Sequence, residues 1–175
     1  MSETILISNG LLLNQITESD VEDLAAAIGS REVYDNVLMV PHPYSLSDAV
    51  SWVRYVEKQK QQFGELLNWC IRKEGKLIGG IGFHDPVTQP HRREMGYWLA
   101  VEHWGQGIMT KTIATFAEFA NRERGITRLE APVYATNIGS QKVLERNGFV
   151  KEGTLAKAYL KDGEYKDAFL YARIW

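Results

Sequence analysis

Hydrophobic residues recur along the chain at two spacings, one typical of strands and one typical of helices. Alternating apolar and polar residues, such as Leu67, Trp69 and Ile71 with polar residues between them, place one set of side chains on one face of a strand. By this criterion, strands are predicted over residues 4–16, 66–73, 77–83, 94–101, 126–134, 149–159 and 165–174. Helices are predicted over residues 17–28, from 45 to about 63, between 107 and 125, and over 137–146.

The clearest helical pattern lies between Gly107 and Gly125. Its apolar positions form one stripe, made of Met109, Ile113, Phe116, Ala117 and Ala120. Two other helices begin with side chains that favour helix N-termini, at residues 17–20 and 45–48. Residues 30–45 show no such pattern and are expected to be irregular.

Short turns rich in Asn, Asp and Gly separate several of these elements. Asn9-Gly10 breaks the first strand, Glu74-Gly75 joins two strands as a hairpin, and residues 161–164 join the last two strands. The order is strand, two helices, strands, helix, strand, helix, strands, which differs from the regular alternation of a doubly wound sheet. A mixed α/β (α+β) layer is therefore expected.

Length and composition indicate one soluble domain. The chain has 175 residues, with 20 Lys and Arg against 22 Asp and Glu, so its net charge of -2 disfavours a nucleic-acid partner bound through bulk positive charge. This length suits a single domain over residues 1–175. No apolar run approaches the ~18 residues of a membrane span, residues 1–9 lack the features of a signal peptide, and the single cysteine fits a reducing compartment. A cytoplasmic protein without a membrane partner is expected.

Glycines at positions 105 and 107 lie where the strand at 94–101 leads into the next helix. Such glycines let backbone N–H groups converge on one point, and the helix N-terminus adds about half a positive charge, so a phosphate or pyrophosphate can bind there. A tight turn that simply requires two glycines fits the spacing as well, because the segment matches neither a Walker loop nor GxGxxG. The glycines within residues 79–82 lie inside a predicted strand, where close packing is the more frequent reason for glycine.

Three segments resemble motifs of the GNAT acetyltransferases, in the order in which that family has them. Residues 94–99 (EMGYWL) with 104–110 (WGQGIMT) are similar to the acetyl-CoA-binding segment. Residues 137–149 (NIGSQKVLERNGF) resemble the second cofactor-side motif, and residues 152–167 resemble the C-terminal hairpin of the Rim-type branch. That branch includes ribosomal-protein N-terminal acetyltransferases. The resemblance covers nearly the whole chain.

The resemblance implies the GNAT fold, with a mixed, mostly antiparallel central sheet of about six to seven strands and flanking helices. It implies acetyl-CoA as the acetyl donor and no metal. Backbone N–H groups of residues 105–110 would bind the pyrophosphate, and pantetheine would lie along residues 99–101 like an added strand. The implied cofactor-binding residues are Leu99, Ala100, Val101, Gly105, Gln106, Gly107, Ile108, Met109, Thr110, Asn137 and Lys142. Rim-type relatives are often dimers, so a homodimer is one expectation.

Acetyl transfer to an amine requires that the amine lose a proton, and Glu94 is the candidate base. It lies two residues before Gly96, where the family often has Glu. The alternative is an exposed strand carboxylate paired with Arg92 or Arg93.

Ser140 is the candidate acid that protonates the leaving thiolate, because it matches the serine given this role in Rim-type relatives. Asn137 matches the asparagine that contacts the cofactor or an ordering water. The tyrosine that many GNAT members use as the acid corresponds here to Leu144. The alternative is structural, with Asn137 as a helix N-cap and Ser140 in the first turn.

Histidine and cysteine residues predict no metal site. His42, His84, His91 and His103 show no metal-ligand spacing, and His84 after its strand either faces the acceptor or is a solvated loop residue. Cys70 as a covalent nucleophile is less favoured than Cys70 as a small strand residue.

The acceptor is the open question. In the family, the loop between the first two helices shapes the acceptor site, so Tyr34, His42 and Tyr44 are candidates for specificity. The expected activity is direct transfer of acetyl from acetyl-CoA to a primary amine, first a protein N-terminus. The alternatives are a small-molecule amine, such as an amino acid, polyamine or antibiotic, and a non-catalytic acyl-CoA-binding domain.

Overall fold

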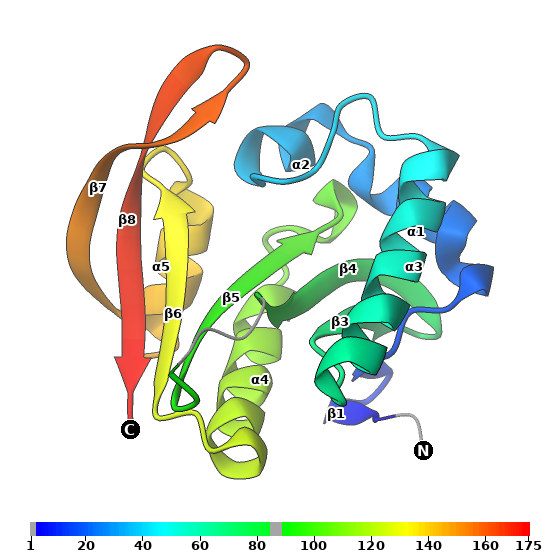
Figure 1. Ribbon diagram of the computed structural model, residues 1–175, viewed down its shortest axis with the longest axis horizontal. Coiled ribbons are helices and arrows are strands. Elements are labelled where there is room, and N and C mark those ends of the chain that lie inside the picture. Colours follow the sequence, from blue (N-terminus) through cyan, green and yellow to red (C-terminus); the bar gives the residue numbers. More distant parts are fainter. Residues whose placement is uncertain (1–2, 85–88) are drawn as a thin grey trace. The chain divides into compact units, whose positions relative to one another are not determined.

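The computed structural model describes residues 3–84 and 89–175, which group into two compact units (Figure 1). The first unit comprises residues 1–83 and 96–106, and the second comprises residues 84–95 and 107–175. Strand β5 (Arg92–Leu99) begins in the second unit and ends in the first.

Four strands of the first unit follow one another as antiparallel neighbours. They are β1 (Ile5–Ser8), β2 (Leu11–Asn14), β3 (Asn68–Lys73) and β4 (Lys76–Phe83). Glu74 and Gly75, between β3 and β4, have φ values of 52° and 84°, as a two-residue hairpin turn of type I′ requires. The hairpin predicted at Glu74-Gly75 is therefore confirmed.

The first unit also contains helical segments of different lengths. They are η1 (Glu18–Asp20), α1 (Val21–Ile28), α2 (Arg31–Asn36), α3 (Leu46–Phe63) and η2 (Val101–His103). Helix α1 contacts both α3 and β4 (Figure 1). Helix α3 begins with the predicted capping box, in which Ser45 and Asp48 accept each other's backbone N–H, and it ends at Gly64 with φ 72°.

Helix α2 corrects the expectation that residues 30–45 are irregular. Its N-cap is Ser30, whose Oγ accepts a hydrogen bond from the backbone N–H of Val33 at 3.2 Å. The helix has six residues, of which Val33 alone is buried. One buried position cannot produce a helical period in the sequence, so the pattern did not indicate this helix.

The glycines within residues 79–82 are explained by close packing inside the first unit. A Cβ on Gly79 would lie 2.5 Å from the carbonyl oxygen of Trp98, and one on Gly80 would lie 2.6 Å from Trp98 Nε1. A Cβ on Gly82 would lie 2.6 Å from the carbonyl oxygen of Leu67. The packing interpretation of these glycines is confirmed.

In the described residues of the second unit there are two helices and three further strands. They are α4 (Ile108–Arg124), β6 (Arg128–Tyr134), α5 (Ile138–Arg146), β7 (Val150–Lys161) and β8 (Glu164–Ile174). β5 pairs in parallel with β6, whereas β6–β8 and β7–β8 are antiparallel. The whole predicted stripe of α4, from Met109 to Ala120, is buried.

Helices α4 and α5 each accept a hydrogen bond from a side chain of β8. Tyr171 and Arg173 are two residues apart on β8, so their side chains point to one face. The Tyr171 hydroxyl donates to Glu145 of α5 at 2.9 Å, and Arg173 Nη2 donates to Glu118 of α4 at 2.6 Å.

The strand order is β1-β2-β3-β4-β5-β6-β8-β7, which makes eight strands where about six to seven were expected. The additional strand arises because residues 4–16 form two strands. Gly10, with φ 72°, reverses the chain between β1 and β2. Among the described residues, no helix combines the length and the hydrophobicity needed to cross a membrane.

Candidate active site

The glycine turn ends at the N-cap of helix α4, which is Gly107. Gly105 and Gly107 have φ values of 72° and 71°, and a Cβ on either would meet nothing within 4 Å. Backbone conformation, and not packing, is therefore what requires glycine here. Glycine has no side chain to accept the first N–H groups of the helix, so these donors and the positive end of the helix dipole can serve an anion.

The first two side chains that follow the glycine turn are buried in the core. The side chains of Ile108 and Met109 are buried, with 7% and 8% of their surface exposed, whereas Gln106 and Gly107 are exposed. Met109, although large, therefore contributes to the core.

The segment predicted to line pantetheine, Leu99 to Val101, already uses its three carbonyl groups. Trp104 Nε1 donates to the carbonyl of Leu99 at 2.7 Å, and the backbone N–H groups of His103 and Trp104 donate to Ala100 and Val101 at 3.0 Å. These bonds hold the chain in a bend immediately after β5. A ligand pairing with this segment would have to bond the second carbonyl lone pairs or an N–H group.

Glu94, on the first half of β5, contacts a residue that the sequence did not single out as its partner. Its Oε1 lies 2.8 Å from Nδ1 of His84, and the His84 backbone N–H donates to the Glu94 carbonyl at 2.9 Å. Of the two arginines suggested as alternative partners, Arg92 bonds Glu130 at 2.7 Å and Arg93 bonds the backbone carbonyls of Pro90 and Arg92. No local pattern relates residues 84 and 94, so only the fold could show this contact.

Asn137 and Ser140 meet at the N-terminus of α5. Asn137 is the N-cap, and its Oδ1 accepts the backbone N–H of Ser140 at 3.0 Å. Lys142 is exposed, whereas Leu144 has no exposed surface. The position where many relatives carry a catalytic tyrosine therefore contributes to the hydrophobic core here.

A third residue near Glu94, Tyr159 of β7, was missed because no motif marks it. Burial raises the pKa of its hydroxyl, and the negative charge of Glu94 raises it further. Its ring packs edge-on against Tyr134 at 5.6 Å between centroids, and the Tyr134 carbonyl accepts the N–H of Asn137 at 2.9 Å. The electrostatic influence of Glu94 on Tyr159, the Tyr159–Tyr134 ring contact and the Asn137 hydrogen bond thus lead from β5 to the start of α5.

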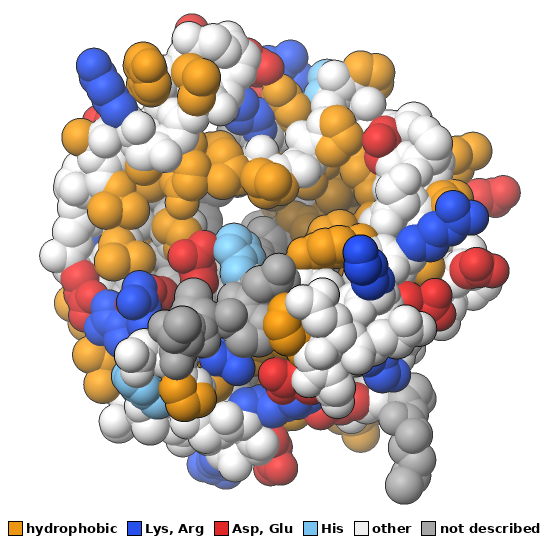
Figure 2. Space-filling view, in the orientation of Figure 1, with side chains coloured by type: hydrophobic (Ala, Val, Ile, Leu, Met, Phe, Trp, Pro, Cys, Tyr) orange, Lys and Arg blue, Asp and Glu red, His pale blue; other side chains and the backbone are white. Residues whose placement is uncertain are grey.

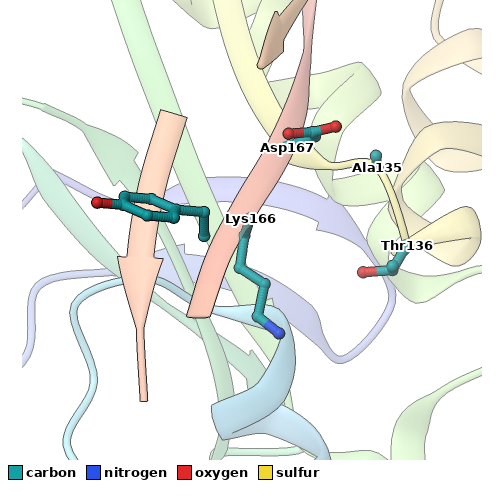
Figure 3. Close-up of a pocket in the computed structure, with 5 residues that line it drawn as sticks. Ala135, Thr136, Lys166 and Asp167 are labelled. Atoms are coloured by element: carbon teal, nitrogen blue, oxygen red, sulfur yellow. The ribbon is translucent and has the colours of Figure 1, made fainter. Parts of the chain in front are cut away.

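A pocket of about 340 Å³ lies beside the start of α5 (Figure 3). Its lining comprises Ala135 and Thr136, just before the Asn137 cap, and residues 165–167 of β8. Lys166 and Asp167 point in different directions, as successive strand residues do (Figure 3). Asp167 Oδ1 accepts the Lys157 N–H at 2.7 Å. The pocket offers an ammonium, a carboxylate and backbone groups beside Asn137.

In the first unit, the region proposed for acceptor specificity is ordered by aromatic contacts. The rings of Tyr34 and His42 lie 5.1 Å apart, and the Arg31 guanidinium lies 5.2 Å from the Tyr34 ring. Burial raises the pKa of Tyr44 to about 12, and Asp48 contributes in the same direction.

Cys70 is buried in β3, and burial raises the pKa of its thiol to about 12; Arg72 opposes this rise and Asp20 adds to it. Almost no thiolate exists near neutral pH at such a pKa, so Cys70 is a poor nucleophile. Among the residues that the structure describes, no three His, Cys, Asp or Glu side chains are grouped as metal ligands would be.

Basic and acidic side chains are interspersed on the face shown in Figure 2. This mixture agrees with the net charge of -2 and differs from the basic stripe of a typical nucleic-acid-binding surface.

Known sequences place this chain in a family. Residues 10–150 match the acetyltransferase (GNAT) domain. The uncharacterized N-acetyltransferase YoaA of Bacillus subtilis (strain 168) is 31% identical over 172 residues, which cover 96% of this chain and 95% of YoaA. Two proteins of Escherichia coli (strain K12) are each 28% identical. The first is the ribosomal-protein-serine acetyltransferase, and the match covers 99% of this chain and 98% of that protein. The second is the L-amino acid N-acetyltransferase AaaT, and the match covers 94% of this chain and 98% of AaaT.

Solved structures of acetyltransferases share the fold of this chain. RimL, a ribosomal L7/L12 α-N-protein acetyltransferase, superposes in its apo form with a TM-score of 0.88 at 24% identity, covering 100% of this chain and 96% of RimL. Its complex with coenzyme A gives a TM-score of 0.86 at 25% identity, covering 98% of both chains. The chain therefore belongs to the GNAT family of acetyltransferases and is an N-acetyltransferase.

Proposed function

We propose that this N-acetyltransferase moves the acetyl group of acetyl-CoA directly onto a primary amine, in a single domain over residues 1–175. The observation that carries the choice of donor is the N-terminus of α4, where Gly107 leaves backbone N–H groups available to an anion. The coenzyme A complex of RimL supports the same donor.

The proposed cofactor contacts follow the chain. The pyrophosphate binds the backbone N–H groups of residues 105–110, and pantetheine lies along residues 99–101. Later in the chain, Asn137 and Lys142 at α5 also contact the cofactor.

Direct attack is favoured over a covalent enzyme intermediate because Cys70 is the single cysteine of the chain and is buried as a neutral thiol. The amine loses its proton to a group centred on Glu94, and Ser140 protonates the leaving thiolate. Both residues lie in the second unit, where Tyr159 is near Glu94 and packs against Tyr134, whose carbonyl accepts from the Asn137 cap that also bonds Ser140.

The first acceptor proposed is a protein N-terminal amine, because the relative that acts on ribosomal-protein serine matches this chain from end to end. The second is the α-amine of an amino acid, which AaaT supports at the same identity. A cytoplasmic location and a homodimer stay predictions from the sequence.

Acetyl-CoA at ~100 times its dissociation constant should stabilise the fold by about 2.7 kcal/mol. Differential scanning fluorimetry with acetyl-CoA, coenzyme A and acetyl-pantetheine measures this stabilisation as a shift in melting temperature. Acetyl-pantetheine, which lacks the pyrophosphate, should give a much smaller shift. Equal shifts with acetyl-pantetheine and acetyl-CoA would contradict the pyrophosphate site at α4.

A screen of candidate acceptors identifies the amine that is acetylated. It compares peptides with different N-termini with amino acids, polyamines and aminoglycosides, and mass spectrometry detects the acetylated products. Acetylated peptides support the first acceptor and acetylated amino acids the second. Stabilisation by acetyl-CoA without transfer to any amine would contradict the proposed activity.

A Cys70→Ala variant should keep nearly full kcat, because the buried thiol takes no part in direct transfer. Rapid-quench kinetics should show no amine-independent burst of coenzyme A release in either protein. A burst in the wild type that disappears in Cys70→Ala would overturn direct attack.

A further inference from the structure

His84 and Glu94 hold each other through two hydrogen bonds within the second unit. The backbone N–H of His84 donates to the Glu94 carbonyl at 2.9 Å, and the imidazole Nδ1 lies 2.8 Å from Glu94 Oε1. The first bond fixes where the two residues meet, and the second fixes the plane and tautomer of the ring. A neutral His84 that donates its Nδ1–H to Glu94 carries its lone pair on Nε2.

Both side chains are accessible to a substrate. The His84 side chain is 57% exposed and that of Glu94 is 37% exposed. In this arrangement the imidazole is the more exposed member of the pair. An ammonium that approaches the pair can therefore reach the ring.

Four charged side chains on β5, β6 and β7 near Glu94 bond one another. Glu130 of β6 is its neighbour across the parallel pair, and two like charges at such positions repel. Glu130, however, is bonded by Arg92 of β5 at 2.7 Å and by Arg128 of β6 at 2.5 Å. Arg128 also bonds Glu152 of β7. This network is balanced without Glu94.

Tyr159 of β7 is a further titratable group near Glu94. It stays protonated near neutral pH, because burial and the charge of Glu94 raise its pKa. The charge of Glu94 is thus available to stabilise an imidazolium at His84.

We propose that His84 Nε2 is the group that takes the proton from the acceptor ammonium, and that Glu94 is a positioning residue that acts through His84. This inference rests on the proposed function and sharpens it. An N–H bond of the ammonium breaks, its electron pair stays on nitrogen, and the proton joins Nε2. The amine lone pair then attacks the thioester carbon, and the C–S bond breaks with its electron pair on sulfur. Ser140 gives its proton to the thiolate and regains one from the acylated nitrogen, and His84 returns its proton to water.

The first test is His84→Asn, because the Asn side-chain amide can still donate to Glu94 but cannot accept the proton. The value of kcat/KM should fall by about 100-fold or more, because general base catalysis typically contributes about 100- to 10,000-fold. The acetyl-CoA-induced shift in melting temperature should be unchanged. The matched control is His91→Asn, an exposed histidine of the same unit, which should retain wild-type kcat/KM.

The second test is the pH profile of Glu94→Gln. Loss of the carboxylate destabilises the imidazolium, so the acid limb of kcat/KM should move to lower pH while the activity at its plateau falls. If Glu94 itself were the base, this limb would disappear in Glu94→Gln. The double variant His84→Asn/Glu94→Gln should be no less active than His84→Asn alone, because Glu94 acts through the ring.

The outcomes distinguish failure of the role of His84 from failure of the proposed function. A folded His84→Asn with wild-type kcat/KM and an unchanged acid limb overturns the role of His84 and leaves the proposed function intact. Disappearance of the acid limb in Glu94→Gln also overturns it, even if His84→Asn fails to fold. A wild-type protein that acetylates no amine overturns the proposed function and this inference together.

Discussion

Replacing Gly107 with valine should weaken acetyl-CoA binding by about 5- to 150-fold, equivalent to about 1–3 kcal/mol. Gly107 has φ 71°, a conformation that a β-branched residue adopts only under strain. When the turn relaxes, the N–H groups at the start of α4 no longer converge on one point. The space beside the glycine, open for 4 Å, would also be filled by methyl groups. Isothermal titration calorimetry measures the affinity.

The matched control is Gly125→Val at the other end of the same helix. Gly125 has φ 65° and likewise has nothing within 4 Å of its Cβ position, so the backbone strain is similar. It should cost similar stability, measured by urea unfolding, and leave the affinity for acetyl-CoA unchanged. Equal losses of affinity in the two variants would show that helix stability, and not the turn, governs binding.

Replacing Arg72 with methionine should lower the free energy of unfolding at pH 7 by about 3–5 kcal/mol, because it leaves the carboxylate of Asp20 buried without its charge partner. Asp20 is 5% exposed, and Arg72 Nη2 donates to its Oδ2 at 2.8 Å. Methionine keeps much of the aliphatic stem, so the loss of charge dominates. The control is Arg31→Met, which removes an exposed pair with Asp35 and should cost at most about 1 kcal/mol.

The same pair predicts a pH dependence. Burial alone would raise the pKa of Asp20, but hydrogen bonds from Arg72 and Thr17, with the charge of Arg72, lower it below the usual value. Its contribution to stability is therefore present above the unfolded pKa of about 3.9 and is lost as the pH falls through the folded pKa. The stability difference between wild type and Arg72→Met, from urea unfolding at several pH values, should shrink below about pH 4. A constant difference between pH 7 and pH 3 would contradict this assignment.

The elements predicted correctly are those whose signals lie within a few residues. The stripe of α4 repeats within each helical turn, the capping box at Ser45 needs four residues, and the turn at Glu74-Gly75 needs two. Helix α2 was missed because it buries one side chain. The eighth strand was missed because Gly10 reverses a run that was expected to be a single interrupted strand.

For the candidate site, the sequence alone determined its chemistry in outline: a glycine turn before a helix, an asparagine cap, and a glutamate on the preceding strand. Each depends on local backbone conformation or on a motif that is continuous in the chain. Tertiary structure decided which side chains meet. His84 contacts Glu94, Tyr159 of β7 lies near the same carboxylate, and Arg72 reaches Asp20. Strand pairing and burial bring such residues together across 10 to 65 positions of chain, and no spacing pattern records a contact of that kind.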